Sequence, residues 1–198
     1  MKKLFLLLLI VSSGMAVIAS QKDETRHEIA VGWGIVPNSA LLDGLFELTN
    51  VAVSGGSVSY ENESYAGPLS VEYFYHLSKT VGVGGIGAYT FNEQDVVLHR
   101  TKIGVAKTHY FTIMPAAKFD WLRKSHWGLY SKVGAGISCR TEKIDWKDES
   151  DDKKTDNVLF NFQASVIGME VGNAHVRGFA ELGIGEQGLG VLGVRCRF

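Results

Sequence analysis

Apolar and polar residues alternate along most of this chain, and no long helical periodicity competes with that pattern. Residues 68–77, for example, place Leu69 and Val71 on one face of a strand and Ser70 and Glu72 on the other. Successive side chains of a strand point to opposite faces, so this alternation indicates strands with one apolar face. The pattern predicts an all-β protein with eight strands, at residues 28–36, 68–77, 81–91, 108–122, 127–141, 158–171, 176–185 and 189–198.

The first 20 residues are typical of a secretory signal peptide and not of the fold. Lys2 and Lys3 precede an unbroken apolar run, and small residues follow up to Ala19 and Ser20. The apolar run is too short to span a membrane comfortably, and charged residues resume at Lys22, which disfavours an anchoring helix. We therefore expect residues 1–20 to be removed and residues 21–198 to form one domain.

The links between the predicted strands alternate in length. Residues 78–80, 123–125 and 173–175 are tight, whereas long polar stretches follow the first, third and fifth strands; the short link 186–188 breaks this alternation. No uncharged apolar stretch of residues 21–198 is long enough for a transmembrane helix, so a membrane form of this chain must be a closed barrel. We predict an eight-stranded, antiparallel, up-and-down transmembrane β-barrel with short periplasmic turns and longer extracellular loops.

The apolar faces of neighbouring strands agree across the three tight links. Residues opposite each other in a hairpin share a face. A three-residue link pairs odd-numbered residues with odd-numbered ones and even-numbered residues with even-numbered ones. At each of the three links, the two apolar rows that are predicted to face outward have the same parity. The expected pairs, or pairs of their neighbours, are Leu77 with Val81, Trp121 with Trp127, and Val166 with Ala180.

The aromatic residues of the outward rows sort by depth. Two aromatic girdles flanking a band of smaller residues are typical of a barrel in lipid. A secreted β-sandwich also alternates apolar and polar residues, but it has shorter strands and no reason for such sorting. The expected girdles are Tyr75, Trp121, Trp127 and Phe198 at the short-turn rim, and Tyr89, Phe91, Phe111 and Phe160 at the long-loop rim.

The opposite, inward rows carry full charges in the middle of strands. A small barrel can pair such charges inside its narrow lumen, so we interpret them as an ionic network. A catalytic set or a path for protons or solutes is the alternative. The expected network consists of Glu72, Lys118, Asp120, Lys132, Arg177, Glu181 and Arg195.

The chain ends on an aromatic residue with apolar residues at every second position before it: Leu192, Val194, Cys196 and Phe198. This pattern resembles the C-terminal signal that the barrel-assembly machinery of outer membranes recognises, although Gly190 stands where an aromatic residue is usual. The chain resembles small barrels of the OmpA and OmpX kind, and residues 67–73 and 178–185 resemble outer-membrane barrels of Bacteroidetes. The resemblance implies the outer membrane of a Gram-negative bacterium, contact with its lipid, and no particular reaction.

The remaining chemistry of the sequence is sparse. Cys139 and Cys196 both fall on outward rows but at opposite membrane depths, so we expect two lipid-facing thiols and no disulfide. The histidines show no metal-ligand spacing, and no cofactor or metal is expected. Removal of Lys2 and Lys3 leaves 18 Lys and Arg against 21 Asp and Glu, which is no footprint for nucleic acid.

The favoured function is therefore a non-enzymatic, monomeric outer-membrane barrel of structural or surface-interaction type, with an unknown extracellular ligand for the long loops. One alternative is an enzyme that modifies lipid of the outer leaflet, for which His109 with Thr108 or Thr112 and a loop carboxylate is the candidate set. The other alternative is a narrow pore.

Overall fold

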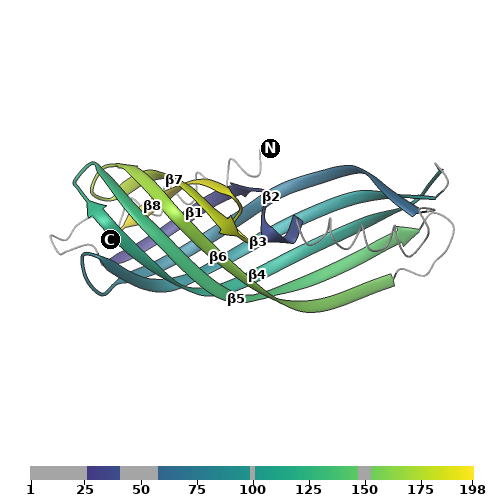
Figure 1. Cartoon of the computed structure of the whole chain (residues 1–198), viewed down its shortest axis with the longest axis horizontal. Helices are drawn as coiled ribbons and strands as arrows, with labels where there is room; N and C mark the ends of the chain where they lie inside the picture. The colour runs from purple at the N-terminus through teal and green to yellow at the C-terminus, as the bar shows by residue number, and fades with distance from the viewer. Residues whose placement is uncertain (1–25, 41–57, 99–100, 147–152) are drawn as a thin grey trace.

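The computed structural model describes residues 26–40, 58–98, 101–146 and 153–198. Eight strands close into one barrel in which all neighbours are antiparallel and, apart from β1 with β8, consecutive in the chain (Figure 1). The predicted fold class is therefore confirmed; the predicted signal peptide lies outside the described residues. The strands are β1 (His27–Ile35), β2 (Val58–His76), β3 (Val81–Leu98), β4 (Thr101–Arg123), β5 (Trp127–Trp146), β6 (Lys153–Gly172), β7 (Val176–Gly185) and β8 (Gly190–Arg197).

The seam between β1 and β8 closes the barrel with a regular ladder. Val31 pairs with Val194 and Trp33 with Leu192. At the end of the seam, His27 and Phe198 exchange two backbone hydrogen bonds of 2.9 Å. Both ends of the barrel-forming chain therefore meet at the rim that carries the tight turns.

Side-chain oxygens hold two of the tight turns at that rim. Ser78 Oγ accepts hydrogen bonds from the backbone N–H groups of Thr80 and Val81, at 3.2 and 3.0 Å. Asn173 Oδ1 accepts from His175 and Val176 in the same way, at 2.9 and 2.7 Å. Short polar side chains that bond the backbone ahead of them favour turns, which explains why the chain reverses here.

Five of the strands are about twice as long as the other three. β1, β7 and β8 have 9, 10 and 8 residues, whereas β2 to β6 have 18 to 23. Figure 1 shows the long strands continuing well past the short ones on the side away from the tight turns. The barrel is closed along part of its length, and a five-stranded curved sheet extends from it.

The long extensions correct the expected loops after the third and fifth strands. Residues 92–98 pair with 101–108, and Lys143 pairs with Lys154, so most of these polar stretches are strand. Alternation does not reveal these segments in the sequence, because polar residues stand on both faces of the extension. Backbone pairing with a neighbour, and not an apolar face, holds such a strand.

The two faces of the barrel have opposite character. Large apolar side chains stand exposed on the outer wall, among them Phe160, which is 73% exposed. The inward positions of the same strands hold buried polar and charged residues. In a water-soluble protein, large apolar residues are mostly buried and charged residues mostly exposed. The barrel has the opposite arrangement.

Bulges shift the register in the middle of several strands and correct two of the three expected pairings. Leu77 and Val81 continue the observed register of His76 with Gly82. In contrast, Phe119 pairs with Ser131, and not Trp121 with Trp127, because of a shift between Asp120 and Leu122. Ala180 pairs with Met169 and not with Val166, because an irregularity between Ser165 and Ile167 moves the outward row of β6 by one residue.

The two cysteines are free, and they differ in exposure. Cys139 is exposed on the outer wall, as expected. Cys196 is only 9% exposed, so the expectation of a lipid-facing thiol is wrong for this residue. Its flanking cross-strand neighbours are Ile29 and Val176, whose larger side chains stand on either side of the short thiol.

This difference predicts the reactivity of the two thiols. In mild detergent, Cys139 should react with a small maleimide at least tenfold faster than Cys196, because buried thiols are inert. Mass spectrometry of the variants Cys139→Ser and Cys196→Ser measures the two rates separately. Equal rates would show that the wall around Cys196 is open.

Among the described residues, no helix is both long and apolar enough to cross a membrane.

Candidate functional site

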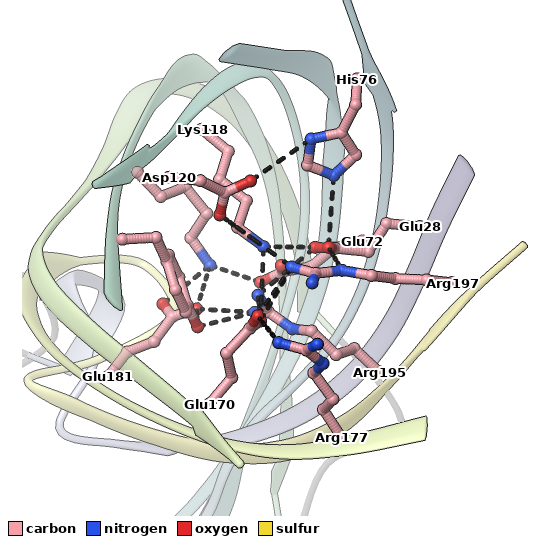
Figure 2. A network of polar contacts seen from close by, with 12 residues as sticks. Glu28, Glu72, His76, Lys118, Asp120, Glu170, Arg177, Glu181, Arg195 and Arg197 are labelled. Atoms are coloured by element: carbon pink, nitrogen blue, oxygen red, sulfur yellow. Dashed lines mark hydrogen bonds and ion pairs between the residues drawn. The ribbon is translucent and has the colours of Figure 1, made fainter. Parts of the chain in front are cut away.

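Charged side chains fill the half of the lumen nearest the tight turns (Figure 2). Five carboxylates and five cations lie there among the described residues, each at most 5% exposed, together with His76. The carboxylates are Glu28, Glu72, Asp120, Glu170 and Glu181, and the cations are Lys118, Lys132, Arg177, Arg195 and Arg197. We call this set the lumen network.

The strand period places these residues on one face. Lys118 and Asp120 stand two residues apart on β4, as do Arg195 and Arg197 on β8, so both members of each pair point inward. On β3, Gly82 lies opposite His76, and a Cβ there would lie 3.3 Å from the imidazole ring. The glycine leaves room for the imidazole.

Glu28 is bound by side chains from three other strands. Its Oε1 accepts a hydrogen bond of 2.6 Å from Lys118 Nζ, and its Oε2 accepts one of 2.8 Å from Arg197 Nε. His76 Nε2 lies 3.3 Å from the same Oε2. Charge-assisted bonds of this kind are shorter and stronger than neutral ones, so Glu28 joins β1 to β2, β4 and β8.

Lys132 lies between two carboxylates. Its Nζ donates to Glu72 Oε1 and lies 2.8 Å from Glu181 Oε2. Glu181 also accepts hydrogen bonds of 2.6 Å from the Tyr130 hydroxyl and 2.7 Å from Ser165 Oγ. The two carboxylates compensate the fully buried ammonium group for the loss of its hydration.

Glu170 forms ion pairs with three guanidinium groups. Arg177 Nη1, Arg195 Nη1 and Arg197 Nη2 lie 2.7, 2.9 and 2.8 Å from its oxygens. Arg195 also lies 3.4 Å from Glu28 and 3.5 Å from Glu181, so it touches three of the five carboxylates. The lumen network is therefore continuous across the barrel.

Two cations lie over the Tyr130 ring in the centre of the lumen network. Lys118 Nζ and the Arg195 guanidinium carbon each lie 4.3 Å from its centroid. Cations over an aromatic face are attracted by the negative electrostatic potential of its π electrons. Gly168 on β6 pairs with Tyr130, and a Cβ at that position would lie 2.4 Å from the ring.

The link between β7 and β8 folds inward over the lumen network. Gln187 Nε2 donates to Glu72 Oε1 at 2.7 Å, and its backbone N–H donates to Gln163 Oε1 at the same distance. Glu186 accepts hydrogen bonds from Asn161 Nδ2, at 2.8 Å, and from the backbone N–H of Ser39, at 3.1 Å. This explains the short link in the sequence, because the turn closes the lumen instead of extending outside.

The seven charged residues predicted for the lumen all lie in this network. Sequence reasoning did not single out Glu28, His76, Glu170 or Arg197. Parity already placed Glu28, His76 and Arg197 on inward rows, so a signal for them existed. Glu170 had none, because the irregularity after Ser165 reverses its parity.

The aromatic residues predicted for the girdles lie on the outer wall of the barrel. At the tight-turn rim, the His27 ring stacks on Phe198 with centroids 5.6 Å apart, and its Nδ1 lies 2.9 Å from the Tyr73 hydroxyl. Trp121 Nε1 donates to Ser131 Oγ at 3.0 Å. Of the four residues of the C-terminal pattern, Leu192, Val194 and Phe198 are exposed outward, and Cys196 is the buried exception.

The candidate set for a lipid-modifying enzyme is divided between the two faces. Thr108 and Thr112 are buried on the inner face, whereas His109 bonds the Tyr89 hydroxyl on the outer face at 2.8 Å. On the outer face, His109 pairs with Thr141, which donates to Asp156 at 2.8 Å. The carboxylate thus holds the hydroxyl and not the imidazole, which is not the nucleophile, base and orienter arrangement of a triad.

No protein-family model matches the chain, and no curated protein matches it in sequence. Among solved structures, it is similar to Ail, the attachment invasion locus protein of Yersinia pestis, with a TM-score of 0.47 and 13% identity over 89% of this chain and 100% of that chain. It is also similar to the outer membrane protein OprG from Pseudomonas aeruginosa, with a TM-score of 0.48 and 14% identity over 88% of this chain and 97% of that chain. The function of this chain is therefore inferred from its own residues.

Proposed function

We propose that this protein is an outer-membrane β-barrel of structural or surface-interaction type, without catalysis and with a lumen closed by its own side chains. The observation that carries the proposal is the reversed polarity of the barrel. A charged, paired interior and an exposed apolar wall suit a protein whose outer solvent is lipid. The aromatic residues at both rims of the wall suit the two membrane interfaces.

The orientation follows from the lengths of the strands. A tilted spanning strand needs about 9–11 residues, which β1, β7 and β8 roughly supply. β4 has 23 residues, about 75 Å at 3.3 Å per residue. We place the tight turns and both ends in the periplasm and the extension of β2 to β6 outside the cell, where it presents a large surface to an extracellular ligand.

Fractionation of cells that produce the protein tests this location. We expect it in the outer membrane, resistant to extraction with high salt, with Lys143 in the extension, whose side chain is 46% exposed, open to an impermeant amine reagent added to whole cells. Recovery as a soluble periplasmic protein would contradict the proposal. Labelling of Lys79 and not Lys143 from outside would reverse the orientation.

A barrel with this interior should not conduct ions. In planar bilayers, the reconstituted protein should give no discrete steps above background at 1 M KCl, because the lumen network and the inward link leave charged groups paired across the lumen. The double variant Gln187→Gly/Glu72→Gln removes the hydrogen bond between the inward link and the lumen network. It should raise the frequency of conducting events. Regular steps from the unaltered protein would favour the narrow pore.

The C-terminal pattern of Leu192, Val194, Cys196 and Phe198 supports recognition by the barrel-assembly machinery. Phe198 lies at the tight-turn rim, where its ring stacks on that of His27. A monomer suffices for all these features, since the barrel closes on itself. The resemblance to barrels of the OmpA and OmpX kind and of Bacteroidetes stays a prediction.

A further inference from the structure

A cavity of about 540 Å³ opens at the tight-turn mouth of the barrel, beneath the lumen network. It lies between the link after β2 and the link after β4, and its floor is formed by the ends of β2, β4, β7 and β8. Six cationic residues line it: Arg26, Lys79, Arg123, Lys124, Arg177 and Arg197.

The charge of this mouth is not balanced by its own lining. Asp120 is the one carboxylate among the residues that line the cavity. It is shared, because its oxygens lie 3.4 Å from His76 Nδ1, 3.6 Å from Lys118 Nζ and 4.0 Å from Arg197 Nη2. The deeper carboxylates are committed to the lumen network, and within the lining of the cavity itself cationic residues outnumber carboxylates six to one.

Arg197 supplies an independent sign of a missing partner. Its Nε is bonded to Glu28 and its Nη2 to Glu170, yet its buried Nη1 has no hydrogen-bond partner. The residue is 2% exposed and lines the cavity. Figure 2 shows its side chain pointing into the barrel toward the other charged residues. Buried donors on charged groups are rarely left unsatisfied, because the desolvation is then uncompensated. An anion in the cavity would satisfy it.

The mouth is held in place before any ligand arrives. Arg177 Nη2 donates to the carbonyl oxygens of Lys124 and Ser125, at 2.9 and 3.0 Å, and Arg177 Nη1 donates to Glu170. These bonds tie the link after β4 to the lumen network. The backbone that carries the Arg123 and Lys124 side chains is therefore fixed, which reduces the entropy lost on binding.

We propose that this mouth binds a phosphate group. A phosphate offers several oxygens and up to two negative charges to donors that converge from different directions, and guanidinium groups match its geometry. The group can belong to the headgroup of a phospholipid in the adjacent leaflet or to a free phosphate ester. The inference goes beyond the structural role of the barrel and does not depend on its orientation.

The test uses the protein in a maltoside detergent, which contains no phosphate. Inorganic phosphate is titrated at constant ionic strength while backbone amide resonances are followed by NMR. We expect saturable shifts confined to the residues that line the cavity, at 26, 76–80, 120, 121, 123–125, 174, 177 and 197, and the double variant Arg123→Gln/Lys124→Gln should weaken binding at least tenfold. Lys143→Gln, at the far end of β5, is the matched control and should bind like the unaltered protein.

Two further arms identify the source and exclude plain charge attraction. Dihexanoyl phosphatidylglycerol binding more tightly than inorganic phosphate would assign the site to a lipid headgroup, and comparable affinities would assign it to free phosphate esters. Equal shifts with chloride or acetate, shifts that do not saturate, or a double variant that binds unchanged while its thermal unfolding is normal would each overturn the proposal.

Discussion

Replacing Lys132 with alanine should lower the free energy of unfolding by about 3–5 kcal/mol, the range for removing one partner of a buried ion pair. The substitution leaves Glu72 and Glu181 facing each other, both buried, without the ammonium group that lies between them. Urea unfolding from lipid vesicles, followed by the fluorescence of the four tryptophans, measures the loss.

An exposed lysine of the same strand provides the control. Lys143 pairs with Asp145 at 3.1 Å, but their side chains are 46% and 37% exposed. Lys143→Ala should therefore cost no more than about 1 kcal/mol. The triple variant Glu72→Gln/Lys132→Met/Glu181→Gln should recover most of the loss, since it removes the buried charges together. A similar cost for both single variants would mean that water reaches Lys132.

Gly168→Ala should cost about 3 kcal/mol, the upper end for overpacking a filled interior. The added Cβ would lie 2.4, 2.5 and 2.8 Å from three atoms of the Tyr130 ring. The ring cannot move aside freely, because Lys118 and Arg195 stack on it and its hydroxyl donates to Glu181. The thermal midpoint should fall together with the free energy.

Gly178→Ala is the matched substitution for this test. A Cβ at residue 178 would lie 3.9 Å from Val171 O and 4.0 Å from Gly193 O, which is ordinary contact, on the outer wall. Alanine there should be neutral or slightly stabilising, because it removes backbone freedom from the unfolded chain. Equal midpoints for the two variants would place Gly168 away from the ring.

The parts of the fold that follow from alternation were predictable from the sequence. The bounds predicted for the strand at 176–185 are those of β7, and the inward rows placed Lys118, Lys132 and Arg195 inside. The positions of these residues could be predicted because one face of each strand meets lipid and the other meets a narrow lumen. Apolar and polar residues therefore alternate along the strand.

Features that depend on neighbouring strands were not predictable. The irregularity that turns Glu170 inward shifts the register of β6 against both β5 and β7, and the alternation of residues 165–167 does not reveal it. Polar residues stand on both faces in the extensions of β3 and β5, so alternation does not reveal these segments. Burial of Cys196 depends on Ile29, which is remote in the sequence.

The bond between Glu28 and Arg197 joins residues 169 positions apart, nearly the two ends of the barrel-forming chain. Such contacts make folding slow, because the loop must close before they stabilise anything. Until β8 arrives, Glu28 and Glu170 lack two of their cationic partners, Arg195 and Arg197, and an open barrel would expose incompletely paired carboxylates to lipid. Insertion should therefore be a single cooperative step, in which the cations of β8 neutralise carboxylates of β1 and β6.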